Sequence, residues 1–310
     1  MKKISILVPC YNEEDNVVPM SEALVDMLTS KLPQYDYEIV FIDNCSTDNT
    51  RPLLREICRK NPKIKAIFNA RNFGQFNSPY YGMLQTTGDC TITICCDFQD
   101  PVELVPVFVE KWESGAKIVS GIKVTSDEGH VIRFLRTCYY KLIRKLSSVE
   151  QIEHFTGFGL YDKTFVDVLR NLHDPTPFIR GIVAELGFKR VDVPYRQAKR
   201  RAGKTHNNFK TLYDAAMLSF TTYTKTGPRV ATIVGALGCM TSVVAEIVFT
   251  ILRFTKYTSL PLLPISIVLF MIFLLFGQWF FIGYLGEYVM NMNARILNRP
   301  LVIEEERINF

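Results

Sequence analysis

The chain has 310 residues, of which 48% are hydrophobic and 22% are charged, and its formal net charge at pH 7 is +5. This length allows one large domain or two small ones. A positive charge this modest, gathered beside long apolar runs, favours contact with anionic lipid and argues against a nucleic-acid partner. The first residues turn acidic and polar before any long apolar region forms, so no secretory signal peptide is expected.

The first part of the chain alternates strand and helix patterns. Strands are predicted at 4–8, 37–43, 64–69, 91–97 and 116–122, and helices at 12–30, 46–61, 78–87 and 101–115. The first of these helices is expected to carry acidic residues in its first turn. The alternation predicts an α/β fold with a mostly parallel sheet covered by helices on both faces. Ligands of such sheets bind beyond the carboxyl ends of the strands.

The pattern loosens after Gly121. A basic helix is predicted at 129–146, with further helices around 166–172 and 178–186, a strand near 189–195 and a basic loop at 196–208. From Phe209 onward, apolar residues recur at helical spacing beside lysines. This predicts a helix that either lies at a membrane interface or packs on the domain.

Two long apolar segments follow, at 230–252 and 262–285, and Glu246 is the only charged residue in them. Each is long enough to cross a hydrocarbon core of about 30 Å. The flanking basic residues predict that both termini lie in the cytoplasm and that the protein is a multi-pass protein of the cell membrane. Glu246 inside a span is also compatible with a homo-oligomer. The sequence predicts three parts. They are a cytoplasmic domain at 1–203, a basic loop with an interfacial helix at 204–229, and a two-span hairpin with a short cytoplasmic tail at 230–310.

The chain has eight cysteines, and none forms a Cys-x-x-Cys pair. A structural zinc site needs grouped thiolates with short spacers, which this spacing does not provide. Reduced cysteines that act as small hydrophobic residues are therefore predicted.

Acidic side chains follow three of the predicted strands. Asp97 ends the fourth predicted strand and Asp100 follows it, where a carboxylate can hold Mg²⁺ or Mn²⁺ while the ion bridges substrate phosphates. Acidic loops are also ordinary turns, so the neighbouring strand ends matter. Asp43 ends the second strand and can hydrogen-bond a base or ribose. After the first strand, Tyr11 can stack on a base and Glu13 can accept its N–H.

In this combination the chain resembles glycosyltransferase family 2, the nucleotide-sugar enzymes of the GT-A fold. The matching pieces, in order, are VPCYNEEDN, DNCSTDNT, ARNFGQ, DFQDPVE, FTGFGLYDK, PFIRGIVAELGF and VPYRQAKRRAGKT. With the paired apolar segments, the resemblance extends to the polyprenyl-phosphate glycosyltransferases, which include dolichol-phosphate mannose synthase and the bactoprenol glucosyltransferases. It implies an inverting transferase that moves a hexose, by default glucose from UDP-glucose, to polyprenyl phosphate (undecaprenyl phosphate in bacteria) at the cytoplasmic face. A flippase is an implied partner.

The resemblance also assigns roles to single positions. Pro9, Tyr11 and Glu13 match the nucleotide-base loop, and Asp43 matches the base or ribose contact. Asp97 matches the second acid of the family's Asp-x-Asp metal motif, with Mg²⁺ or Mn²⁺ as the ion. The other implied donor contacts lie beside this acid or in the loop that closes over the diphosphate: Cys96, Gln99, Arg200, Lys204 and His206.

Three positions depart from the family pattern. Cys95 replaces the first acid of the metal motif, and a thiol is a poor ligand for Mg²⁺. His206 replaces a lysine, which would make diphosphate binding sensitive to pH. The segment TGFGLYD lacks the acid often assigned as catalytic base, for which Asp162 or Glu153 is the expected substitute. A polyprenyl phosphate is already an anionic nucleophile, so alignment and charge neutralisation should suffice, with Arg180 on the acceptor phosphate and no covalent intermediate.

Three other functions fit parts of the sequence. A degenerate transferase that serves as a membrane scaffold would explain the altered motifs. A processive polysaccharide synthase of the same family would carry a QxxRW motif and usually more spans, and this chain has neither. The stretch AKRRAGKT resembles the phosphate-binding loop of an NTPase, but it comes late in the chain and lacks the first glycine.

Overall fold

A computed structural model describes residues 1–125, 152–172, 174, 177–198, 200–202, 217–218 and 300–310, with scattered single positions between 267 and 296. The strands are β1 Lys3–Cys10, β2 Asp36–Asp43, β3 Ile64–Asn69, β4 Cys90–Thr93, β5 Ile118–Thr125, β6 Phe155–Asp162, β7 Arg190–Arg196 and β8 Glu304–Ile308. The helical segments are α1 Val17–Lys31, α2 Thr50–Lys60, α3 Gly74–Leu84, the 3₁₀ turn η1 Val102–Leu104, α4 Val105–Glu113, α6 Lys163–Leu172 and α7 Ile179–Glu185.

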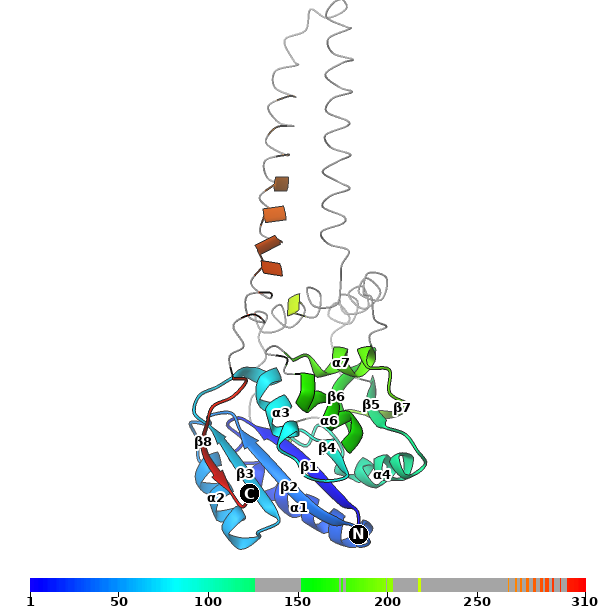
Figure 1. Ribbon diagram of the computed structural model, residues 1–310. Coiled ribbons are helices and arrows are strands. Elements are labelled where there is room, and N and C mark those ends of the chain that lie inside the picture. The colour runs from blue at the N-terminus through cyan, green and yellow to red at the C-terminus, as the bar shows by residue number, and fades with distance from the viewer. Residues whose placement is uncertain are drawn as a thin grey trace, which may run out of the picture.

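Within these residues, the strands form one eight-stranded sheet in the order β7-β5-β6-β4-β1-β2-β3-β8 (Figure 1). The central strands β4, β1, β2 and β3 are parallel, and β5 pairs in parallel with β7. β6 is antiparallel to both of its neighbours, and β8 is antiparallel to β3. The prediction of a mostly parallel sheet is confirmed, with β6 and β8 reversed.

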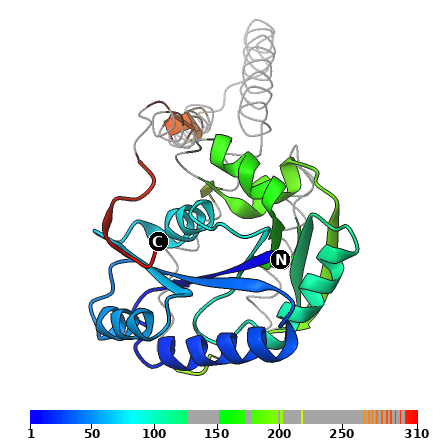
Figure 2. The same cartoon turned by 60° about the horizontal axis from the view of Figure 1, so that its bottom comes forward.

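Helices cover both faces of this sheet, as predicted. Figure 2 shows α1 and α2 on one face and α3 on the other. The strands alternate accordingly, because successive side chains of a strand point to opposite faces. In β1, Ile6 and Val8 belong to the core shared with α1, α2 and α4, whereas Leu7 belongs to the core shared with α3, α6 and α7. All three side chains are fully buried.

One edge of the sheet collects the polar loops. β1, β2, β3 and β4 end there at Cys10, Asp43, Asn69 and Thr93, because parallel strands share an edge for their carboxyl ends. The reversed strands β6 and β8 begin at this edge. We call it the carboxyl edge, and it is the place where the sequence predicts ligands.

Helix α1 begins later than predicted, and its first turn carries no acidic residue. The acidic residues before Val17 form a loop instead. Glu13 is held there because its backbone N–H donates to the Thr50 hydroxyl at 2.8 Å. The prediction of acids in the first turn is wrong, since Glu13, Glu14 and Asp15 all precede the helix.

No helix among the described residues is both long and apolar enough to cross a membrane. The predicted span at 230–252 and the basic helix at 129–146 lie outside the described residues, as do most of the second span and nearly all of the interfacial helix. Lys204 and His206 also lie outside them. The membrane segments and the domain boundaries that depend on them stay predictions.

Candidate active site

The loop after β1 is tied to the turn after β2. Asn12 adopts a left-handed backbone conformation with φ of 55°, which Asn tolerates better than most residues. Its N–H donates to the Ser46 hydroxyl at 2.8 Å, and its side-chain oxygen accepts the Thr47 N–H at 2.8 Å. Together with the bond between Glu13 and Thr50, these contacts fix the predicted nucleotide-base loop as a defined shape.

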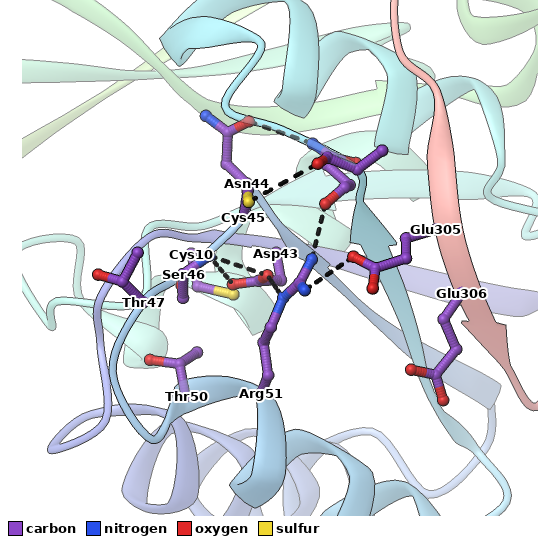
Figure 3. Close-up of polar contacts among 12 residues, drawn as sticks. Cys10, Asp43, Asn44, Cys45, Ser46, Thr47, Thr50, Arg51, Glu305 and Glu306 are labelled. Carbon is purple, nitrogen blue, oxygen red and sulfur yellow. Dashed lines mark hydrogen bonds and ion pairs between the residues drawn. The ribbon is translucent and has the colours of Figure 1, made fainter.

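Asp43, the last residue of β2, has a fully buried side chain at the start of the loop that leads to α2 (Figure 3). Its carboxylate accepts the Ser46 N–H at 3.1 Å and the Arg51 Nε–H at 2.7 Å. A buried carboxylate of this kind is tolerated only when it is paired and hydrogen-bonded. Asp43 therefore orders the turn behind β2, and its direct contact with a base or ribose stays a prediction.

Three asparagines join the loop after β2 to the loop after β3. The Asn44 side-chain oxygen accepts the Phe73 N–H at 2.9 Å and the Asn69 side-chain N–H at 3.2 Å. Its amide group donates to the Asn72 oxygen at 2.9 Å. Asn72 in turn accepts the N–H of Gly74, whose φ of 91° suits glycine. The loops after β1, β2 and β3 thus form one connected unit.

Glu13, Asp97 and Arg200 meet at this edge from three distant segments. Arg200 forms an ion pair with Glu13, and its Nη1 lies 3.7 Å from Asp97 Oδ2. Backbone hydrogen bonds join the same two segments: the Arg201 N–H donates to the Asp97 carbonyl at 3.3 Å, and the Ala198 N–H donates to the Gln99 carbonyl at 3.2 Å. The basic loop therefore folds back over the end of β4.

The charges of this group are largely shielded from water. The side chains of Arg200, Glu13 and Asp97 are 19%, 10% and 12% exposed. Burial raises the pKa of Glu13. The hydrogen bond from Asn16 and the charge and hydrogen bond of Arg200 offset only part of this rise. A cation held between two shielded carboxylates can exchange them for another anion, such as a diphosphate.

Asp100 is a structural residue beside this group. Its side chain is buried and accepts the Tyr195 hydroxyl at 2.8 Å, which ties β7 to the end of β4. Burial raises the pKa of the Asp100 carboxyl, and the hydrogen bonds from Tyr195 and the Cys95 N–H counteract this effect. A side chain engaged in this way is not free to bind a metal ion.

Asp97 is the carboxylate that fits a divalent cation here. No cluster of three or more His, Cys, Asp or Glu side chains suited to a metal ion occurs among the described residues. Mg²⁺ and Mn²⁺ bound with a nucleotide commonly take one or two carboxylates, with phosphates and water as the other ligands. Asp97 suits that arrangement.

The two cysteines before Asp97 differ in exposure. Cys95 is exposed, while Cys96 is buried in the core, and burial raises the pKa of its thiol. Glu13, Asp97 and Arg200 also act on the pKa of this thiol, and a contact of Cys96 with the donor stays a prediction.

Asp162 does not join the site. It ends the reversed strand β6 opposite Cys90, the first residue of β4, and therefore lies at the other edge of the sheet. Its carboxylate accepts the Trp112 indole N–H at 2.7 Å and pairs with Lys117 at 3.1 Å. This position does not suit the expected role as a catalytic base. Glu153 lies two residues before β6.

The other predicted residues lie at the carboxyl edge. Pro9 is near the end of β1, Tyr11 follows it, and Gln99 lies in the turn after β4, each half-buried. Arg180 is half-buried in the first turn of α7, which lies on the side of the domain with the start of β6 (Figure 1). Its role on an acceptor phosphate stays a prediction.

Comparison with known proteins establishes the family. Residues 5–182 match the model of glycosyl transferase family 2, and the chain belongs to this family. The α/β, GT-A-like fold is the architecture that was predicted with it.

Particular relatives are similar along most of their length. The SfII prophage-derived bactoprenol glucosyl transferase of Shigella flexneri is 30% identical over 305 residues, 97% of each chain. The prophage bactoprenol glucosyl transferase homolog of Escherichia coli K12 is 31% identical over 234 residues, covering 75% of this chain and 76% of the relative. Among solved structures, glucosyl-3-phosphoglycerate synthase of Mycobacterium tuberculosis with Mn²⁺, UDP-glucose and phosphoglyceric acid is 18% identical. It gives a TM-score of 0.47 over 71% of this chain and 78% of that one.

Proposed function

We propose that the protein transfers one glucose from UDP-glucose to a polyprenyl phosphate. The observation that carries this proposal is the convergence of Glu13, Asp97 and Arg200 at the carboxyl edge of the sheet. Family membership supports a nucleotide-sugar donor. The name shared by relatives that match 97% of the chain, bactoprenol glucosyl transferase, supports glucose and a polyprenyl phosphate acceptor.

The proposed mechanism uses Arg200 as a mobile counter-charge. When the donor enters, the Arg200 guanidinium leaves Glu13 and Asp97 and binds the diphosphate, which it matches in geometry. Asp97 would hold Mg²⁺ or Mn²⁺, which supplies neutralisation of the departing diphosphate. Tyr11 and Glu13 bind the base, next to the turn that Asp43 orders. Lys204 and His206 of the basic loop bind the diphosphate with Arg200, and Arg180 holds the acceptor phosphate. That phosphate attacks the anomeric carbon in a single inverting displacement.

The acceptor determines where the reaction takes place. A polyprenyl phosphate is anchored in a bilayer, and the two apolar segments predicted at 230–252 and 262–285 would hold the enzyme beside it. The proposed location is the cytoplasmic face of the inner membrane, with the product passed to a flippase. A homo-oligomer built through the spans belongs to the same proposal.

The test uses membranes that contain the full chain, added polyprenyl phosphate, and a panel of radiolabelled nucleotide sugars with Mg²⁺ or Mn²⁺. We expect label in the lipid extract with UDP-glucose, and loss of at least about 100-fold for Asp97→Asn, since this removes the metal-binding charge. The matched control is Asp192→Asn, which removes an exposed acid paired with Arg190 on β7. No labelled lipid with any donor would instead favour the scaffold function, and lipid-free polymers would favour a processive synthase.

A further inference from the structure

The last strand of the chain lies beside the donor site. β8 pairs antiparallel with β3, so that Glu304 lies opposite Asn69 at the carboxyl edge. The Ala70 N–H donates to the Ile303 carbonyl at 2.9 Å, which extends the pairing past the end of β3. Figure 1 shows β8 at the outer edge of the sheet, next to β3. The strand comes from the far end of the chain, beyond the predicted membrane segments.

Arg51 joins β8 to the buried Asp43. Its Nε donates to Asp43 at 2.7 Å, its Nη1 to Glu305 at 2.9 Å, and its Nη2 to the Asn69 carbonyl at 2.6 Å. The guanidinium therefore has a partner on each of its three nitrogens, from β2, β8 and β3 (Figure 3). The Arg51 side chain is 15% exposed and that of Glu305 is 54% exposed. Three such contacts fix the orientation of the planar guanidinium group.

We propose that Glu305 is a positioning residue of the donor site, one that acts on the nucleoside through Arg51 and Asp43. Glu305 holds the outer nitrogen of Arg51, Arg51 orients the Asp43 carboxylate, and Asp43 accepts the Ser46 N–H that shapes the turn. Ser46 in turn binds the Asn12 N–H of the base loop. The nature of the ligand, a nucleoside diphosphate sugar, rests on the proposed function.

The neighbouring acid provides a matched control. Glu306 lies on the same strand but pairs with Arg55, at 2.6 Å, and both side chains are more than a third exposed. In Figure 3, Glu306 points away from Asp43. Loss of either acid removes one ion pair between β8 and α2, so a difference between the two variants measures the link to Asp43 rather than attachment of the strand.

The experiment measures donor kinetics and hydrogen exchange on the full-length protein. For Glu305→Gln we expect a rise of roughly two- to five-fold in KM for UDP-glucose with little change in kcat, the size expected for a half-exposed ion pair. Exchange of the amides at 44–47 should also become faster. Glu306→Gln should leave both quantities as in the wild type. In an Arg51→Lys background, where the fork is absent, Glu305→Gln should add nothing further.

Three outcomes would overturn the inference. They are equal changes in KM for the two single variants, faster exchange at 44–47 without a change in KM, and an undiminished Glu305→Gln effect in the Arg51→Lys background. Failure of the proposed function gives a different result. In that case the wild type itself transfers no sugar and does not bind UDP in calorimetry.

Discussion

Replacement of Arg200 tests the central step of the proposed mechanism. Arg200→Ala removes the cation that lies between Glu13 and Asp97. Arg200→Lys keeps the positive charge but removes the planar guanidinium group with its paired donors. If the guanidinium moves to the diphosphate of the donor, its loss must be felt in the transition state, where negative charge develops on the leaving group. The Arg200→Ala substitution should therefore lower kcat/KM strongly and change the free energy of unfolding less.

The magnitude follows from the contacts of this side chain. A hydrogen bond to a charged group contributes about 1.5–3 kcal/mol, and the guanidinium can present two parallel donors to a diphosphate. One strong contact, added to the repulsion that the unpaired Glu13 and Asp97 then exert on the diphosphate, gives about 3 kcal/mol. This corresponds to a loss of about 100-fold in kcat/KM for Arg200→Ala. Arg200→Lys retains the charge, so about tenfold is expected.

The assay follows transfer of label from UDP-glucose to extractable lipid at several donor concentrations. Arg190→Ala is the control, because Arg190 is on β7, ten residues away in sequence, and pairs with the exposed Asp192. We expect this control to retain wild-type kcat/KM. A value for Arg200→Ala within about threefold of the control would refute the role of Arg200 on the diphosphate, whatever the Asp97 variants show.

Three further predictions concern buried polar residues that support the fold. Asp162→Asn should retain wild-type kcat within about twofold while lowering the melting temperature, because this carboxylate binds Trp112 at the opposite edge of the sheet. Hydrogen bonds from two lysines, a serine and a backbone N–H outweigh burial and hold the pKa of Glu38 at about 2, below its usual value of 4.5. The resulting stability is present above the unfolded-state pKa and is lost as the pH falls through 2. Glu38→Gln should therefore lower the free energy of unfolding by about 2–3 kcal/mol at pH 7, and the difference should vanish between pH 4.5 and 2 in urea titrations. Tyr195→Phe leaves the buried Asp100 short of a donor and should reduce stability by about 1–3 kcal/mol, measured by thermal unfolding.

The central strands were predictable because their signal is local. Each alternates with a helix and carries buried β-branched residues, and β3 has the predicted bounds. The placement of Glu13 and Asp97 followed from topology, since the carboxyl ends of parallel strands share one edge. Arg200, some hundred residues further along, was assigned by resemblance to the family, and the structure brings it to the same two acids.

Strand direction explains what sequence patterns missed. Asp162 follows an apolar strand as Asp97 does, but β6 runs in the opposite direction, so its last residue lies at the wrong edge for the site. No local pattern reports that reversal. β8 was missed for a related reason: its partner β3 is more than 230 residues away in the chain, and only the acids of the strand, facing Arg51 and Arg55, mark its position.

The carboxylates of this edge lead to one more conclusion about donor binding. Asp43 is paired with Arg51, while Glu13 and Asp97 share the single positive charge of Arg200. In the proposed mechanism, binding of a diphosphate by Arg200 is therefore an exchange, in which the interaction gained with the phosphate is reduced by the interactions lost with the two acids. Asp97 then needs a new counter-charge, which a divalent cation supplies. The affinities for donor and cation should consequently be coupled, each raising the other by the same factor, because linkage between two binding events is reciprocal. Independent binding of Mn²⁺ and UDP would show that Arg200 does not leave Asp97 when the donor enters.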